Sequence, residues 1–169
     1  MKELEEALLD GRAHLAVHSA KDLPGELPAG LAVLAVPARE DARDVLVGPE
    51  GGLGALPAGA AVATGSPRRA AQILAARPDV AIVPIRGNVG TRLDKLAAGA
   101  ADALILAAAG LRRLGLDPRG ATPLSVEVST PAPGQGLLAL QGRDDDREVA
   151  AAVAALDDPA AHALSLIHI

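Results

Sequence analysis

The sequence lacks cysteine, phenylalanine, tyrosine and tryptophan altogether. Without cysteine, these 169 residues hold no disulfide, no thiolate metal ligand and no cysteine nucleophile, and we assign no metal ligands of other kinds. Without aromatic rings, and with a net charge of −5, the chain offers neither stacking surfaces nor a basic footprint for nucleic acid. We therefore expect no nucleic-acid partner.

Long apolar runs are also absent, and none approaches the roughly 20 residues that a membrane-spanning helix needs. The first residues, MKELEEALLDGR, predict an acidic amphipathic helix rather than a charged and then apolar signal peptide. The sequence accordingly indicates a cytoplasmic protein with no membrane partner.

Lysine is scarce, because only Lys2, Lys21 and Lys95 among the 16 basic residues are lysine and the rest are arginine. Arginine is the better side chain for holding carboxylate or phosphate at two points. High-GC codon usage is an alternative explanation for the excess of arginine over lysine. The positions of the arginines therefore have to show whether they serve a ligand.

Half of the residues are apolar, and a core of Ala, Val, Leu and Ile suits the layered packing of helices on sheets. Strands are predicted at residues 14–17, 31–36, 45–47, 60–64, 80–85, 103–106 and 137–140. Helices are predicted at residues 2–10, 67–76, 91–98, 108–114 and 145–156. This alternation predicts an α/β protein with mainly parallel sheets and flanking helices.

The segment 38–134 contains its own run of βαβ units and is predicted to form one domain. The flanking segments 1–37 and 135–156 would then belong together as part of another domain. Ligands of open α/β sheets bind at the carboxyl ends of strands, which is where the polar clusters of this chain fall.

The stretch TGSPRRAAQ (residues 64–72) predicts a helix start with Ser66 as N-cap and Pro67 at the first helical position. Arg68 and Arg69 add two charges to the positive end of the helix dipole, which favours an anion site. An ordinary helix start with solvated arginines is the alternative.

A similar design occurs in IRGNVGTRLDKL (residues 85–96), where Arg86 ends a strand and Arg92 lies in the first turn of a helix. A cation there opposes the dipole, so a bound anion would explain it better than stability does. A third arginine pair occurs in AAAGLRRLG (residues 107–115), although arginines near the end of a helix are common without any ligand. The stretch STPAPGQG (residues 129–136) places Gln135 in a hinge-like segment.

The stretch AVHSAKDLP (residues 16–24) ends an apolar strand in several polar groups. Asp22 is the one carboxylate in this motif, whereas the clusters at the other strand ends carry arginines. It therefore suits stabilising a cation or accepting N–H hydrogen bonds. His18 could be a catalytic base, but we favour a structural, partly buried histidine.

Six motifs in register resemble the porphobilinogen deaminase (hydroxymethylbilane synthase) family. They are AVHSAKDLP, EDARDVLV (residues 40–47), TGSPRRAAQ, IRGNVGTRLDKL, AAAGLRRLG and PAPGQG, and the likeness runs from KELEEALL to LDDP. The family's pattern differs at Gly65, where Ser is usual, at Pro67, where a bulkier apolar residue is usual, and at Gln141, where an acid is usual.

The resemblance implies two lobes like those of periplasmic binding proteins, the first incomplete and the second nearly complete. It implies a transferase of tetrapyrrole, porphyrin and heme biosynthesis that condenses four porphobilinogen molecules, with release of ammonia, onto a covalent dipyrromethane cofactor. The implied partners are porphobilinogen and the growing polypyrrole chain, and the implied full-length state is a monomer.

The resemblance also implies roles for residues at matching positions. Asp22 would be the catalytic residue that holds pyrrole N–H groups and stabilises the azafulvenium cation left when ammonia departs. The matching cofactor- and substrate-binding residues are Ser19, Lys21, Thr64, Ser66, Arg68, Arg69, Arg86, Asn88, Arg92, Arg113 and Gln135.

Against that family the chain is expected to be a fragment that lacks the start of the first domain and the third domain with its cofactor-bearing cysteine. Residues 157–163 would begin the third domain, and residues 164–169 would be a non-native tail, since LSLIHI is the translation of a known transposon end. Such a fragment is expected to be inactive alone. The competing interpretations are a two-lobed anion-binding protein without catalysis and a regulatory or structural α/β domain.

Overall fold

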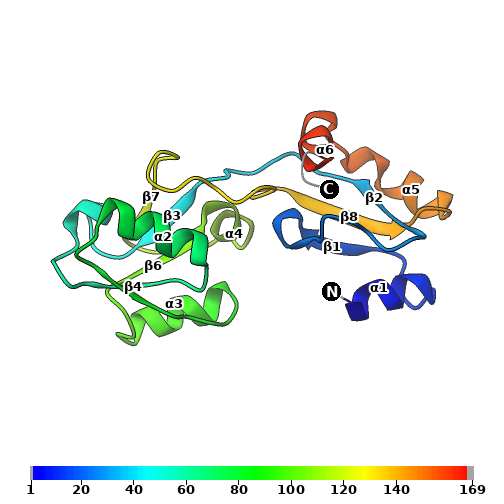
Figure 1. The fold of residues 1–169 in the computed structure, drawn as a ribbon. Coiled ribbons are helices and arrows are strands. Elements are labelled where there is room, and N and C mark those ends of the chain that lie inside the picture. Colours follow the sequence, from blue (N-terminus) through cyan, green and yellow to red (C-terminus); the bar gives the residue numbers. More distant parts are fainter. Residues whose placement is uncertain (1, 167–169) are drawn as a thin grey trace. The chain divides into compact units, whose positions relative to one another are not determined.

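The computed structural model describes residues 2–166 and shows an α/β chain in two compact units (Figure 1). The first unit joins the residues up to 40 with those from 133 onward, and the second comprises residues 41–132. The chain therefore passes from one unit to the other twice. That these units correspond to domains 1 and 2 of a longer enzyme stays a prediction.

The first unit contains one small sheet with strand order β1-β8-β2. Its elements are α1 (Lys2–Leu9), β1 (Ala16–Ser19), η1 (Ala20–Asp22), β2 (Leu31–Ala35), β8 (Leu138–Arg143), α5 (Arg147–Val153), η3 (Ala154–Leu156) and α6 (Pro159–Ser165). Both β1 and β2 pair antiparallel with β8. The pairing is antiparallel because the chain leaves this unit after β2 and re-enters before β8 at the same end of the sheet.

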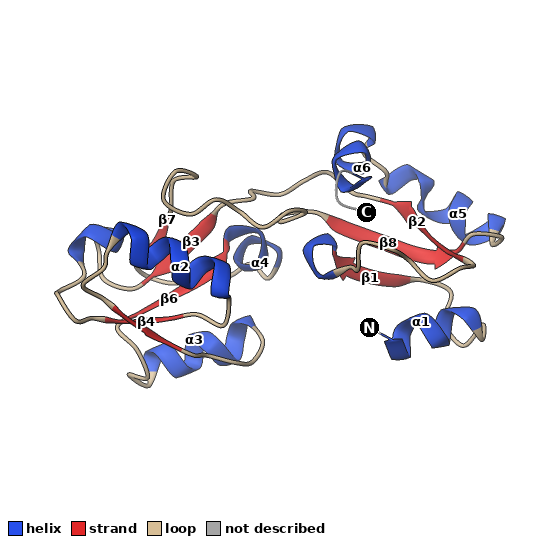
Figure 2. Ribbon diagram, viewed as in Figure 1, coloured by secondary structure: helices blue, strands red, loops and turns tan. Residues whose placement is uncertain are grey.

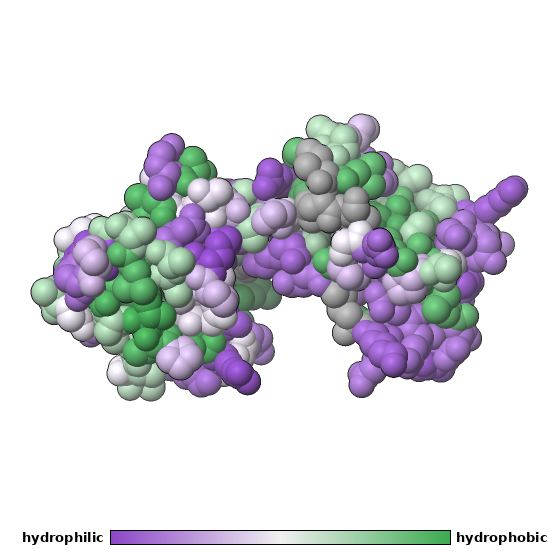
Figure 3. All heavy atoms as spheres, viewed as in Figure 1, coloured by the Kyte–Doolittle hydropathy of each residue, from purple (hydrophilic) through white to green (hydrophobic). Residues whose placement is uncertain are grey.

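Helices α1 and α5 pack against this small sheet through small clusters of apolar side chains. Leu8 of α1 clusters with Ala16 and Leu31, whereas Val153 of α5 clusters with Ala35 and Leu140. The outer surface over α1 is strongly hydrophilic (Figure 3), which agrees with the acidic amphipathic helix predicted there.

The second unit contains a five-stranded sheet with strand order β5-β4-β6-β3-β7. Its elements are β3 (Asp44–Val47), η2 (Gly52–Ala55), β4 (Ala61–Ala63), α2 (Pro67–Ala76), β5 (Ala81–Val83), α3 (Val89–Ala97), β6 (Ala103–Ala107), α4 (Ala108–Arg113) and β7 (Ala121–Pro123). Strand β4 pairs parallel with β5 and β6, whereas β3 pairs antiparallel with β6 and β7. Parallel pairing thus occupies the βαβ part of this sheet and is absent from the first unit's described strands.

Alternating side chains of the central strands divide the core of the second unit into two layers, with helices on both sides of the sheet (Figure 2). Leu46 and Ile105 face α2 through Ile73, whereas Val45 and Leu104 belong to the cluster that packs on α3 and α4. This two-sided burial is typical of an α/β fold. The loops that precede α2 and α3 follow the parallel strands β4 and β5, so they lie at the same edge of the sheet.

The expected α/β class and the order of the predicted elements are confirmed, with local corrections. Strand β1 begins at Ala16 rather than residue 14, so His18 and Ser19 belong to it. Strand β7 lies at residues 121–123, where no strand was predicted, and its Pro123 is tolerated because β7 is an edge strand. The helix expected at 145–156 is shorter and ends in η3.

The C-terminal segment forms α6, and its Ala161 packs with Leu137 and Ala139 of the first unit. The assignment of residues 157–163 to a third domain stays a prediction. The proposed tail, residues 164–169, lies partly outside the described residues. None of the helices between residues 2 and 166 is long and apolar enough to cross a membrane.

A carboxylate stabilises the first connection where it enters the second unit. Asp41 accepts hydrogen bonds from Arg43 Nε and Nη2, at 3.0 and 2.7 Å, and from Arg112 Nη2 at 3.3 Å. Hydrogen bonding to Arg43, together with the charges of both arginines, lowers the pKa of Asp41 to about 2.

Asp41→Asn should lower the free energy of unfolding by about 1 kcal/mol at pH 7, since both arginine partners are substantially exposed and solvent weakens the pairs. A carboxyl group with a lowered pKa stabilises the fold above its ordinary pKa, and that contribution is lost as pH falls through the folded value. The difference between wild type and variant should therefore shrink between pH 4 and pH 2. Urea unfolding followed by circular dichroism measures it, because the chain has no Trp or Tyr fluorescence.

Asp94→Asn is the control, because Asp94 is exposed on α3. It should show no comparable change with pH. A difference between wild type and Asp41→Asn that stays constant from pH 7 to pH 2 would mean that the charge of Asp41 is not its cause.

Candidate active site

The start of α2 is built as the sequence predicted. Ser66 is the N-cap, its Oγ accepts a hydrogen bond from the backbone N of Arg69 at 3.4 Å, and Pro67 occupies the first helical turn. Thr64 Oγ1 accepts from the backbone N of Ser66 at 3.1 Å. A Cβ on Gly65 would lie 2.9 Å from the backbone oxygen of Ile85, so glycine allows this turn to pass close to the neighbouring loop.

The start of α3 follows the same plan with a different cap. Asn88 Oδ1 accepts from the backbone N of Thr91 at 2.8 Å, so this side chain caps the helix. Arg92 Nε donates to Gly87 O at 2.7 Å and Lys95 Nζ donates to Arg86 O at 2.9 Å. The cations at this helix start are therefore held partly by backbone carbonyls, while the Arg86 side chain is exposed.

The two helix starts border one open pocket of about 530 Å3. Five of the predicted binding residues line it: Thr64, Ser66, Arg69, Arg86 and Arg92. It contains arginine guanidinium groups beside the N-terminus of α2, so its chemistry favours anions. A ligand with several carboxylates would match more of these groups than a single small anion would.

The first unit carries the remaining polar cluster at the end of β1. Ser19 precedes the short helix η1, which contains Lys21 and Asp22. The backbone N of Ala20 donates to Leu137 O at 3.1 Å, which ties this helix to the segment before β8. Asp22 is exposed, and no hydrogen bond or ion pair to its carboxylate is found within residues 2–166.

Other predicted residues lie elsewhere. Gln135 is 1% exposed, and its backbone oxygen accepts from Arg39 Nε at 3.0 Å. Arg113 is exposed in the last turn of α4, outside the pocket at the helix starts. His18 is buried with its Nε2 2.9 Å from Gln141 Oε1, which favours the structural interpretation.

Sequence reasoning missed the carboxylate that holds Arg68 and Arg69. Asp44, the first residue of β3, is fully buried and pairs with both guanidinium groups. The available signal was a charged residue directly before the apolar run VLV, within the motif EDARDVLV. A buried charge at the start of a central strand is rare without a partner.

Comparison with solved structures identifies the fold as that of periplasmic substrate-binding proteins. A putative methionine-binding lipoprotein from Bacillus subtilis is similar with a TM-score of 0.59 at 13% identity, covering 95% of this chain and 77% of that one. A periplasmic substrate-binding protein of an ABC transporter from Coxiella burnetii has a TM-score of 0.56 at 18% identity, covering 95% and 78%. At these identities the likeness establishes the fold alone.

The chain belongs to the porphobilinogen deaminase family, because residues 1–151 match the family model described as "Porphobilinogen deaminase, dipyromethane cofactor binding domain". The porphobilinogen deaminase of Roseiflexus sp. (strain RS-1) is 53% identical over 160 residues, covering 94% of this chain and 53% of the relative. That of Sorangium cellulosum (strain So ce56) is 54% identical over 159 residues, with the same coverage. The chain thus spans about half the length of these curated relatives.

Arg86→Leu should weaken binding of a polycarboxylate to the pocket by about tenfold while the melting temperature stays within about 2 °C of wild type. The reason is that the exposed Arg86 side chain adds charge to the pocket but is not part of the packed core. Its loss also relieves repulsion with Arg92. Calorimetric titration with porphobilinogen and thermal denaturation by circular dichroism measure the two effects.

Arg119→Leu is the matched control, because Arg119 is a highly exposed arginine of the same unit outside this pocket. It should leave binding unchanged. A fall in melting temperature for Arg86→Leu with unchanged binding would instead assign Arg86 a structural role.

Proposed function

We propose that this chain works as part of a porphobilinogen deaminase, which condenses four porphobilinogen molecules into hydroxymethylbilane with release of ammonia. Membership of the family supports this, and the observation that carries it is the arginine-lined pocket at the starts of α2 and α3. Each porphobilinogen carries an acetate and a propionate, so a growing chain of pyrroles presents many carboxylates. In this proposal residues 1–37 with 135–156 belong to domain 1, residues 38–134 form domain 2, and residues 157–163 begin domain 3.

The pocket fits the carboxylate chemistry of the dipyrromethane cofactor that the family description names. Arg69, Arg86 and Arg92 would hold its acetate and propionate groups, and the capped start of α2 adds backbone N–H donors. When bound, the cofactor supplies the primer from which the pyrrole chain is extended. The chain has no cysteine, so these 169 residues alone offer no thiol for its covalent attachment.

Asp22 is the proposed catalytic residue. Its carboxylate is exposed beside Lys21 on the short helix η1 after β1, which leaves its oxygens available to accept pyrrole N–H hydrogen bonds. As ammonia leaves the substrate, positive charge develops on the pyrrole ring, and a fixed carboxylate lowers the free energy of that state. Lys21 is proposed to bind a substrate carboxylate.

The remaining proposed binding residues act in the same way on carboxylates or ring N–H groups: Ser19, Thr64, Ser66, Arg68, Asn88, Arg113 and Gln135. The complete enzyme is proposed to act as a cytoplasmic monomer on porphobilinogen and the growing polypyrrole chain. An anion-binding protein without catalysis is the rival, and product formation by the complete enzyme in the next experiment separates it from this proposal.

Asp22→Asn in the complete enzyme should reduce the rate of hydroxymethylbilane formation at least a hundredfold. The amide keeps the size of the side chain but loses the negative charge, a contribution of about 3 kcal/mol to the transition state. Absorbance of the oxidised product and mass spectrometry of the loaded enzyme measure rate and cofactor content. Glu26→Gln, which removes an exposed charge from the loop that follows, is the control and should retain the rate.

Near-normal turnover by Asp22→Asn would overturn the role of Asp22. Absence of any product from the wild-type complete enzyme would overturn the proposed activity itself.

The 169-residue chain should form no hydroxymethylbilane from porphobilinogen and should gain no covalent mass. It has no thiol that could carry dipyrromethane, although its pocket retains the arginines for reversible binding. The protein is nearly transparent at 280 nm, so bound pyrrole is easily detected by absorbance. Product or a stable mass increase, in a preparation free of host enzyme, would contradict the proposal that a cysteine is required to carry dipyrromethane.

A further inference from the structure

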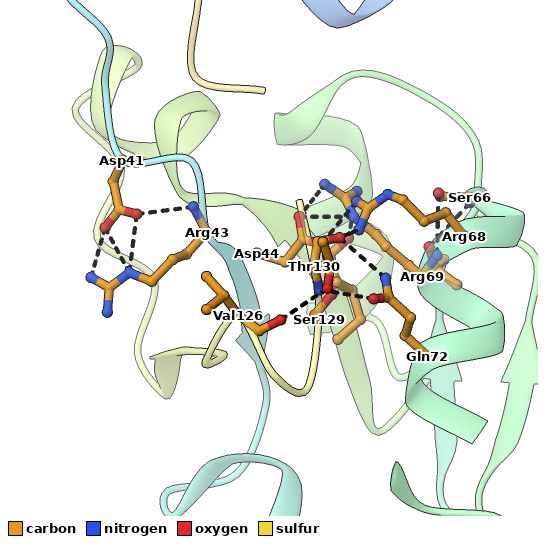
Figure 4. Close-up of polar contacts among 12 residues, drawn as sticks. Asp41, Arg43, Asp44, Ser66, Arg68, Arg69, Gln72, Val126, Ser129 and Thr130 are labelled. Carbon is orange, nitrogen blue, oxygen red and sulfur yellow. Dashed lines mark hydrogen bonds and ion pairs between the residues drawn. The ribbon is translucent and has the colours of Figure 1, made fainter. Parts of the chain in front are cut away.

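Asp44 accepts hydrogen bonds from Arg68, Arg69 and Ser129 on its two carboxylate oxygens (Figure 4). Oδ1 receives Arg69 Nε at 3.0 Å and Arg69 Nη2 at 2.6 Å. Oδ2 receives Arg68 Nη2 at 2.9 Å and Ser129 Oγ at 2.8 Å. A carboxylate has about four lone-pair sites, so this buried group is fully used.

Burial makes the carboxylate indispensable to Arg69. The Asp44 side chain is 0% exposed and that of Arg69 only 7%, whereas Arg68 is 27% exposed. Removing one partner from a buried pair leaves the other as an uncompensated charge, which is costly. Asp44 is therefore the charged partner that holds the Arg69 guanidinium in this orientation, beside a longer hydrogen bond from Nη1 to Ile105 O at 3.5 Å.

The Asp44 carboxylate also holds residues 125–130, which precede the second connection between the two units. Ser129 belongs to residues 125–130, and the backbone of Thr130 is held from α2 by Gln72, whose Oε1 accepts from Thr130 N at 2.8 Å. Arg68 Nη1 donates to the carbonyl oxygen of Thr130. The start of α2, the start of β3 and this segment therefore converge on Asp44 (Figure 4).

We infer that Asp44 is a positioning residue for anion binding: it presents Arg69 to the pocket in a fixed orientation and holds Arg68 beside it. Ser129 supports Asp44 from the side of the 125–130 segment. This inference rests on the proposed function, because it assigns the organiser of that same pocket. Asp44 itself does not line the pocket, so it acts on the ligand through the arginines.

The test is Asp44→Asn in the 169-residue chain, with two measurements. The first is the 1H–15N NMR signal of the Arg69 Nε–H group, which should exchange slowly with water in wild type and at least tenfold faster in the variant. The second is calorimetric titration with porphobilinogen at 10 °C, where each variant is first shown to be folded. The dissociation constant should rise tenfold or more.

Asp79→Asn is the matched control, because Asp79 pairs with Arg77 at 2.7 Å at a more exposed position of the same unit. It should change neither the Arg69 signal nor the dissociation constant. If Asp44→Asn does not fold, Ser129→Ala is the second test, because Ser129 does not line the pocket and its hydroxyl donates to Asp44 Oδ2. It should raise the dissociation constant about threefold, and unchanged affinity would overturn the inference.

The two hypotheses fail in different ways. If wild type binds no porphobilinogen, the proposed function is wrong, and a slowly exchanging Arg69 signal that is lost in Asp44→Asn still supports Asp44 as its anchor. If Asp44→Asn folds and binds porphobilinogen like wild type, Asp44 does not position the pocket, whatever its effect on stability.

Discussion

The buried carboxylate of Asp44 makes it possible for two adjacent arginines to stand at the start of α2. Arg68 and Arg69 lie where the helix dipole already presents positive charge, so their mutual repulsion and the dipole both disfavour them. Asp44 offsets that cost by pairing with both guanidinium groups. The second unit can therefore keep a cationic surface in a chain whose net charge is −5.

The pocket then follows from a strand–turn–helix plan used twice. After β4 and after β5 the chain turns into a helix whose first turn is capped by a side chain, Ser66 in α2 and Asn88 in α3. Because β4 and β5 pair parallel, both helix starts lie at the same edge of the sheet. Two modest anion-binding ends thereby combine into one site that suits a ligand with several carboxylates.

Much of this plan could be predicted from local sequence, and the reasons are physical. The Ser66-Pro67 cap and the helix that follows depend on neighbours within a few residues, and the structure has them where the patterns indicate. The Asp44 cluster joins residues 24, 25 and 85 positions apart, so no local period reveals it. Antiparallel pairing of β8 likewise depends on where the chain re-enters the first unit.

The motif likeness does not separate residues that contact a ligand from residues that hold the fold. The motif likeness treated Arg68, Arg69 and Asn88 as equal to Arg86, yet the first two pair with a buried carboxylate and Asn88 caps a helix. Such roles need not exclude ligand binding, because a side chain held at one atom has less freedom to lose when it binds at another.

The fold and the charged residues support different conclusions about function. Proteins with this fold include the periplasmic binding proteins that the comparisons name, so the fold alone is compatible with binding and nothing more. The exposed carboxylate of Asp22 is a feature that a receptor for anions alone does not need. A reaction in which an anionic substrate becomes locally cationic needs both kinds of charge, arginines for the carboxylates and a carboxylate for the developing cation. The proposed catalysis therefore rests on Asp22 of the first unit as much as on the arginines of the second.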